Sequence, residues 1–127
     1  MSGAKSRSNA NLPVQSDRDA REDARRSEAR AQQRARDELL LSEHERIAAE
    51  LAAAKLGDPE LARAREQVGK WRRDHTCSDW YVHRWTEILS GPPTAVAQRL
   101  RALEAGERMA LVQNTPFGFL LAEQVRG

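Results

Sequence analysis

Residues 17–55 contain neither proline nor glycine, and this property restricts the fold more than any other feature of the chain. The segment consists mainly of Ala, Arg, Glu, Gln and Leu, which are good helix formers. Ser16 is placed to cap a helix, because Asp17 and Asp19 follow it in the first turn, where carboxylates favour the helix dipole. Gly57 is placed to end it. The sequence therefore predicts one helix of about 39 residues, about 60 Å long.

The two halves of this predicted helix differ in their side chains. Residues 17–38 hold seven arginines and seven carboxylates and no large apolar residue, so this half has no face that can join a core. Ion pairs at i,i+4, such as Glu22 with Arg26, contribute roughly 0.2–0.5 kcal/mol each and favour a helix without requiring burial. The second half carries an apolar seam at 7, 4 and 3 spacing, interrupted by His44 and formed by Leu40, Ile47, Leu51 and Ala54.

The seam requires an apolar partner, and two are possible. At about two heptads it is too short to define a coiled coil, so it can pack against another chain or against the C-terminal part of its own chain. Leu40, Ile47 and Leu51 are the candidate partner-binding residues. The expected partner is a different protein or a second copy of this chain, bound through the long helix.

The material for a core lies in the second half of the chain. All six Trp, Tyr and Phe residues follow residue 70. Asp58-Pro59-Glu60 predicts a helix start with Asp58 as the N-cap, and the apolar face of that helix, at 3,4,3 spacing, consists of Leu61, Ala64, Val68 and Trp71. Three further helices are expected at 79–90, from Thr94 to a stop at Gly106, and at 107–113, with the apolar end 117–121 packed back onto them.

These patterns predict an all-α protein with three parts. Residues 1–15, rich in Ser, Asn, Ala and Gly, are expected to form a disordered tail. Residues 16–57 form the long helix, partly coiled-coil-like, and residues 58–127 form a small helical bundle. The single cysteine, Cys77, excludes an internal disulfide, and no apolar run reaches the roughly 20 residues that span a bilayer. A cytoplasmic location is expected because the sequence has no such apolar run and no signal-like N-terminus. The high content of Arg and Ala favours a bacterial or phage origin.

Positive and negative charges are nearly balanced in both halves of the chain, so the protein is not generally basic. Residues 1–57 carry 11 Lys/Arg against 10 Asp/Glu, and residues 58–127 carry 10 against 9. The best local candidate for nucleic-acid contact is a set of five cations with only Glu66 among them, namely Arg63, Arg65, Lys70, Arg72 and Arg73. The nearby Trp71 fits the apolar face of the same helix better than a base-stacking role.

No catalytic, metal or cofactor site is predicted. His75, Cys77 and His83 are close in sequence, but a structural zinc site needs four ligands, usually with paired cysteines. The chain has no glycine-rich phosphate loop and no Ser/His/Asp arrangement, and nothing in it indicates a small-molecule substrate. The expected function is therefore that of a non-enzymatic helical adaptor or regulatory accessory protein acting through protein contacts. The alternative is a small DNA- or RNA-binding regulator that uses the cations between residues 63 and 73.

Residues 80–121 also carry a recurring pattern. A tryptophan helix ends in Ile88-Leu89-Ser90-Gly91-Pro92, a spacer helix follows, and the turn Gln113-Asn114-Thr115-Pro116-Phe117 comes near the end. This pattern resembles a C-terminal segment of small uncharacterised bacterial proteins, some of which are similar to helix-turn-helix regulators. The chain departs from those regulators because no helix-turn-helix precedes the segment. The resemblance implies a compact helical unit anchored by Trp85 and Phe117.

Overall fold

The chain is almost entirely helical. The structure is a computed structural model that describes the backbone of residues 2–126 and the side chains of residues 16–125. No strand occurs in this part of the chain, which confirms the predicted all-α class. The chain divides into two compact units, Met1–Ala35 and Arg36–Gly127, and the helix α1, Ser2–Ala52, contributes to both.

The first unit contains only the N-terminal part of α1. From Ser16 to Ala35 every side chain is exposed except that of Glu22, which is half-buried. Arg26 pairs with Glu22 at 3.5 Å and with Asp23 at 3.7 Å. Such exposed pairs contribute at most about 1 kcal/mol each, so they bias the helix without forming a core. Helix α1 begins at Ser2 rather than after Ser16, so its backbone includes residues 2–15, where the sequence predicts a disordered tail; no side chain before Ser16 is described.

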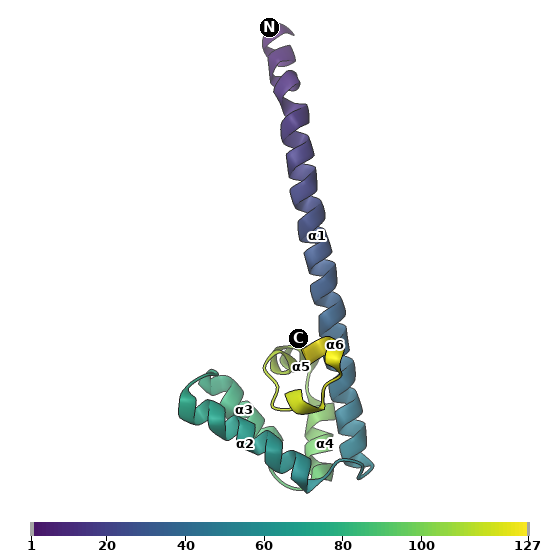
Figure 1. The fold of residues 1–127 in the computed structure, drawn as a ribbon, viewed down its shortest axis with the longest axis vertical. Coiled ribbons are helices and arrows are strands. Elements are labelled where there is room, and N and C mark those ends of the chain that lie inside the picture. Colours follow the sequence, from purple (N-terminus) through teal and green to yellow (C-terminus); the bar gives the residue numbers. More distant parts are fainter. Residues whose placement is uncertain (1, 127) are drawn as a thin grey trace. The chain divides into compact units, whose positions relative to one another are not determined.

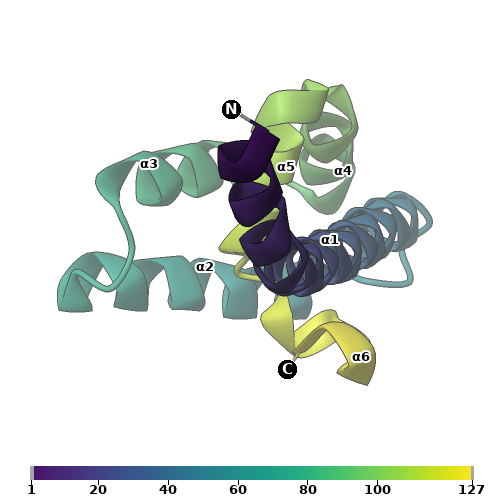
Figure 2. The same ribbon diagram turned by 90° about the horizontal axis from the view of Figure 1, so that it is seen from above.

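The second unit is a bundle in which the C-terminal part of α1 packs with the remaining helices (Figure 1). Helices α2 and α3 lie side by side, and α4 lies beside α1 in both views (Figure 2). The remaining helices have the following bounds: α2 Asp58–Asp74, α3 Asp79–Ile88, α4 Pro93–Ala102, α5 Ala105–Gln113, the 3₁₀ helix η1 Gly118–Leu120 and α6 Glu123–Arg126.

Two helix ends around Gly57 differ from the sequence prediction. Helix α1 ends at Ala52, before the expected Lys55, because Ala54 adopts a left-handed conformation with φ of 59°. Gly57 does not stop α1 but is the N-cap of α2, a role predicted for Asp58. The backbone N–H of Gly57 donates to Oε1 of Glu60 at 2.7 Å, which satisfies a donor that the helix itself cannot pair.

The boundary between α4 and α5 also differs. Gly106, the predicted stop of α4, lies inside α5. Helix α4 ends at Ala102, since Leu103 is extended with ψ of 137°. The side chain of Leu103 is buried, so the first residue after the helix is still part of the core.

One hydrophobic core fills the second unit. Leu61, Ala64 and Val68 of α2 are buried, as their spacing predicts, and Trp71 is half-buried beside them. Trp85 and Phe117 are fully buried, as expected of core anchors. The apolar C-terminal end packs back onto the bundle through its buried side chains, Leu121 and Val125.

Candidate functional site

The seam of α1 is internal. Leu40, Ile47 and Leu51 are 3%, 0% and 1% exposed and belong to the core of their own chain. Ala54, the last residue of the predicted seam, lies beyond the end of α1 and is exposed. The structure thus places the chain's own C-terminal module on the seam, and the three leucine and isoleucine side chains are not a free surface for a second protein. The reason is that the module supplies apolar side chains that cover the seam completely.

His44 joins this seam to the turn that follows α5. Its Nδ1 donates to the carbonyl of Leu40 at 2.7 Å, which leaves Nε2 to accept from the hydroxyl of Thr115, also at 2.7 Å. The Thr115 oxygen accepts the backbone N–H of Phe117 at 3.1 Å. Both ring nitrogens are therefore engaged, and His44 is a structural residue rather than a free base.

Trp85 completes the cluster around this turn. Its indole N–H donates to the carbonyl of Asn114 at 2.8 Å. The rings of Trp85 and Phe117 meet edge to face with centroids 5.9 Å apart, and His44 lies 6.5 Å from Trp85 and 6.2 Å from Phe117. The tryptophan helix and the Asn114–Phe117 turn, which are far apart in the sequence, are thus one structural element.

The stability of this cluster is expected to depend on pH. Burial lowers the pKa of His44 below its ordinary value of 6.5, while the Leu40 carbonyl and Glu43 act in the opposite direction. In the unfolded chain the imidazole binds a proton at higher pH than in the folded chain, so the stability contributed by neutral His44 is present above about pH 6.5 and lost as the pH falls. Urea unfolding should give a lower free energy of unfolding at pH 5 than at pH 7.5.

Two variants check the source of this pH dependence. His83 is exposed, so His83→Gln should keep the wild-type difference between the two pH values. His44→Gln should reduce that difference. An unchanged difference in His44→Gln would contradict the assignment.

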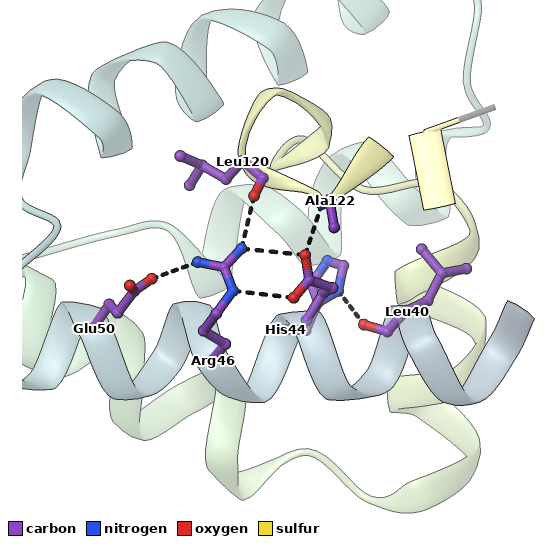
Figure 3. A network of polar contacts seen from close by, with 7 residues as sticks. Leu40, His44, Arg46, Glu50, Leu120 and Ala122 are labelled. Carbon is purple, nitrogen blue, oxygen red and sulfur yellow. Dashed lines mark hydrogen bonds and ion pairs between the residues drawn. The ribbon is translucent and has the colours of Figure 1, made fainter. Parts of the chain in front are cut away.

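A second polar network joins residues 120–122 to α1 (Figure 3). Arg46 donates to both carboxylate oxygens of Glu43 at 3.0 and 3.3 Å, to Glu50 at 2.6 Å and to the carbonyl of Leu120 at 2.7 Å. Glu43 also accepts the backbone N–H of Ala122 at 2.7 Å. The bond from Arg46 is the main cause that lowers the pKa of Glu43, so the carboxylate stays ionised near neutral pH. The network holds the segment after Phe117 against the helix.

An open groove lies between α1, α4 and α5, with Trp85 of α3 at its base. Its volume is about 380 Å³, at the lower end of the roughly 300–1,000 Å³ of ligand pockets. The walls are mainly apolar, formed by Leu41, Ala48, Leu100, Leu103, Leu111 and Val112. Its charged lining residues are Glu45, Arg101 and Arg108.

The two arginines of this groove carry unpaired charge. Arg108 donates to the carbonyls of Arg101 and Leu103, both at 3.0 Å, and so covers the C-terminal end of α4. Among residues 16–125, neither Arg101 nor Arg108 has a carboxylate within ion-pair distance. Since Glu45 is the only acidic residue among the described residues that line it, the groove is apolar inside with a net positive charge at its rim.

The five cations between residues 63 and 73 do not form one face. At about 100° per residue, Arg65 and Arg72 flank the buried face of α2 on one side, while Arg63 and Lys70 lie on the opposite side of the helix. The Arg63 guanidinium lies 4.3 Å above the Phe119 ring. Arg73 is exposed, and Nη1 of its guanidinium lies 3.4 Å from where a Cβ of Gly69 would be. The structure thus divides the predicted set, which weakens the case for a continuous nucleic-acid-binding surface.

No sequence pattern predicted the groove. Arg101 and Arg108 belong to two different helices, and Leu41 lies one residue after the seam position Leu40, so no local spacing connects them. The only sequence signal is that arginines interrupt the apolar pattern of both helices. Their common position depends on how α4 and α5 turn back onto α1.

Metal-ligating side chains do not cluster in the described part of the chain. No group of three or more His, Cys, Asp or Glu residues there could hold a metal ion. Burial raises the pKa of the Cys77 thiol, so its thiolate is a minor species near neutral pH. No described helix is long and apolar enough to cross a bilayer.

Comparison with known proteins finds no matching family model, no matching curated protein and no matching solved structure.

Proposed function

We propose that this protein is a non-enzymatic helical adaptor or regulatory accessory protein, and that it binds a protein partner through the groove between α1, α4 and α5. The observation that carries this proposal is the combination of apolar walls with two unpaired arginines, Arg101 and Arg108, at the rim. An amphipathic segment laid into an apolar groove is a common mode of peptide recognition. The arginines favour a segment with a carboxylate next to its apolar side chains.

The occupant is proposed to be a different protein rather than a second copy of this chain. The exposed part of α1, residues 16–35, has no large apolar side chain and cannot fill an apolar groove. The seam that could have supported a homodimer is already covered within the chain. Residues 16–35 instead offer a charged surface suited to polar contacts.

Peptide display on the full-length chain tests this proposal. The selected peptides are expected to carry two or more large apolar residues at helical spacing with an Asp or Glu beside them. Binding of a selected peptide, measured by fluorescence anisotropy, should fall at least about tenfold in Leu41→Glu and in Arg101→Glu, a loss of about 1.4 kcal/mol. Leu39→Glu is the matched control, because Leu39 is on the same helix but is 39% exposed and does not line the groove.

The outcomes separate the proposal from its alternatives. Equal binding to Leu41→Glu and to Leu39→Glu would place the peptide elsewhere and contradict the groove. Failure to select any peptide with these features would also contradict it. Salt-sensitive binding of the chain to DNA or RNA, lost in Arg63→Glu with Lys70→Glu, would support a nucleic-acid regulator instead.

A further inference from the structure

A second cleft lies between α2 and α3, away from the groove. It has a volume of about 320 Å³, and its lining residues are Arg65, Val68, Gly69, Arg72, Thr86, Leu89 and Ser90. Its floor is apolar, because Val68 and Leu89 are both buried. The cleft is therefore a separate candidate site, and a ligand can bind there whether or not the groove holds a protein.

Three arginines gather around the C-terminal end of α3, beside this cleft. Arg65 donates to the carbonyls of Leu89 and Gly91, both at 2.9 Å. Arg99, from α4, donates to the carbonyls of Ile88 and Ser90. The cleft thus has a fixed basic edge, because both side chains are held by backbone groups of one short segment.

Arg72 supplies the third positive charge. It donates to the hydroxyl oxygen of Thr86 at 3.1 Å. The hydroxyl hydrogens of Thr86 and Ser90 are directed to the carbonyls of Val82 and Glu87, so the arginines are the donors that remain for a ligand. A guanidinium has five N–H donors, and Arg72 uses one of its nitrogens in the described contacts.

These charges are not neutralised by acidic side chains. Within residues 16–125, no carboxylate lies within ion-pair distance of Arg65, Arg72 or Arg99. The carbonyls at the end of α3 supply about half a negative charge, which is small against three full positive charges. The cleft therefore attracts an anion of more than one charge.

Gly69 is a further feature of the cleft wall. It lies inside α2, where glycine costs roughly 1 kcal/mol relative to alanine. A Cβ at this position would lie 3.4 Å from Nη1 of Arg73, which is tight against a flexible side chain. Gly69 lines the cleft together with Arg65 and Arg72, so a side chain at this position would narrow it.

We propose that this cleft binds a phosphate monoester whose organic part lies on the floor formed by Val68 and Leu89. A phosphate monoester carries nearly two negative charges at neutral pH, and its oxygens match the fork of donors that a guanidinium presents. The apolar floor favours an ester over free phosphate. Arg72 is the main direct donor, and Arg65 and Arg99 supply the positive potential around it.

The test is a titration of the full-length ¹⁵N-labelled protein with phenyl phosphate at constant ionic strength, followed by NMR. Saturable shifts are expected at the amides of Thr86 and Ser90. Arg72→Gln should weaken binding about tenfold or more, the effect of losing a charge-assisted hydrogen bond. Lys70→Gln removes the same charge from the opposite side of α2 and should change the dissociation constant by less than about twofold.

A further variant distinguishes weaker ligand binding from loss of folding. Gly69→Ala should raise the thermal stability of α2 and still weaken phenyl phosphate binding, because the added Cβ narrows the cleft. Inorganic phosphate and adenosine monophosphate are the comparison ligands, and weaker binding of inorganic phosphate than of either ester is expected.

Tighter binding of inorganic phosphate, no saturable shift, or equal losses in Arg72→Gln and Lys70→Gln would overturn the proposal. Equally tight binding of an oligonucleotide without terminal phosphates would overturn it in favour of a phosphodiester site.

Discussion

Replacement of Trp85 by alanine is expected to lower the free energy of unfolding by about 3–5 kcal/mol. The side chain is fully buried and packs against the rings of Phe117 and His44, so its removal leaves a cavity at the centre of the bundle. The Asn114 carbonyl also loses the indole N–H that it accepts at 2.8 Å. Urea unfolding followed by far-UV circular dichroism measures this change.

Trp80→Ala is the matched control for this experiment. Trp80 belongs to the same helix but is 47% exposed, so its removal should lower the free energy of unfolding by clearly less than the removal of Trp85. Comparable losses in the two variants would show that Trp85 does not anchor the core. A loss much larger in Trp85→Ala than in Trp80→Ala would support the role of Trp85 as the anchor between its helix and the turn at 114–117.

Replacement of Ile47 by aspartate is expected to destabilise the second unit by at least about 3–5 kcal/mol. Ile47 is 0% exposed in the middle of the seam, where a carboxylate would be buried without a partner. Because small domains are stable by only about 5–15 kcal/mol, the variant should be largely unfolded or highly sensitive to proteolysis. Limited proteolysis and thermal unfolding are the measurements.

A control substitution at an exposed position of α1 distinguishes loss of folding from loss of an intermolecular contact. Ala49→Asp places the same charge two residues further along α1 at an exposed site. Its midpoint of thermal unfolding should be close to that of the wild-type protein. If Ile47→Asp kept its fold and only lost an oligomeric state, the seam would be an intermolecular surface after all. Sedimentation of both variants distinguishes these outcomes.

The two proposed sites use different parts of the second unit. The groove combines α1, α4 and α5, whereas the arginine cleft lies between α2 and α3. Helix α3 contributes to both, since Trp85 is at the base of the groove and Thr86 lines the cleft. Because Leu41 lines only the groove and Arg72 only the cleft, binding at each site can be measured separately through Leu41→Glu and Arg72→Gln.

The sequence by itself determined the all-α class, the positions of most helices and the inward faces of several of them. This was possible because the information is local: the 3,4,3 spacing of Leu61, Ala64 and Val68 predicts one face of α2, and no glycine or proline interrupts residues 17–55. The exact residues at which individual helices begin and end were less predictable. Gly57 caps the start of α2 instead of the end of α1, and Gly106 lies inside α5, because glycine permits several conformations and tertiary packing selects one.

Tertiary structure alone decided which faces meet. The seam of Leu40, Ile47 and Leu51 had two possible partners, and only the packing of the chain onto itself shows that the module covers it. The cations between residues 63 and 73 follow one another in sequence, yet Arg65 and Arg72 join Arg99 of another helix while Arg63 lies on Phe119. The spacing within a helix fixes the direction of each side chain, but the neighbour it meets depends on contacts between residues far apart in the chain. The long uninterrupted helix is thus a property of the local sequence, and the covering of its apolar half is a property of the fold.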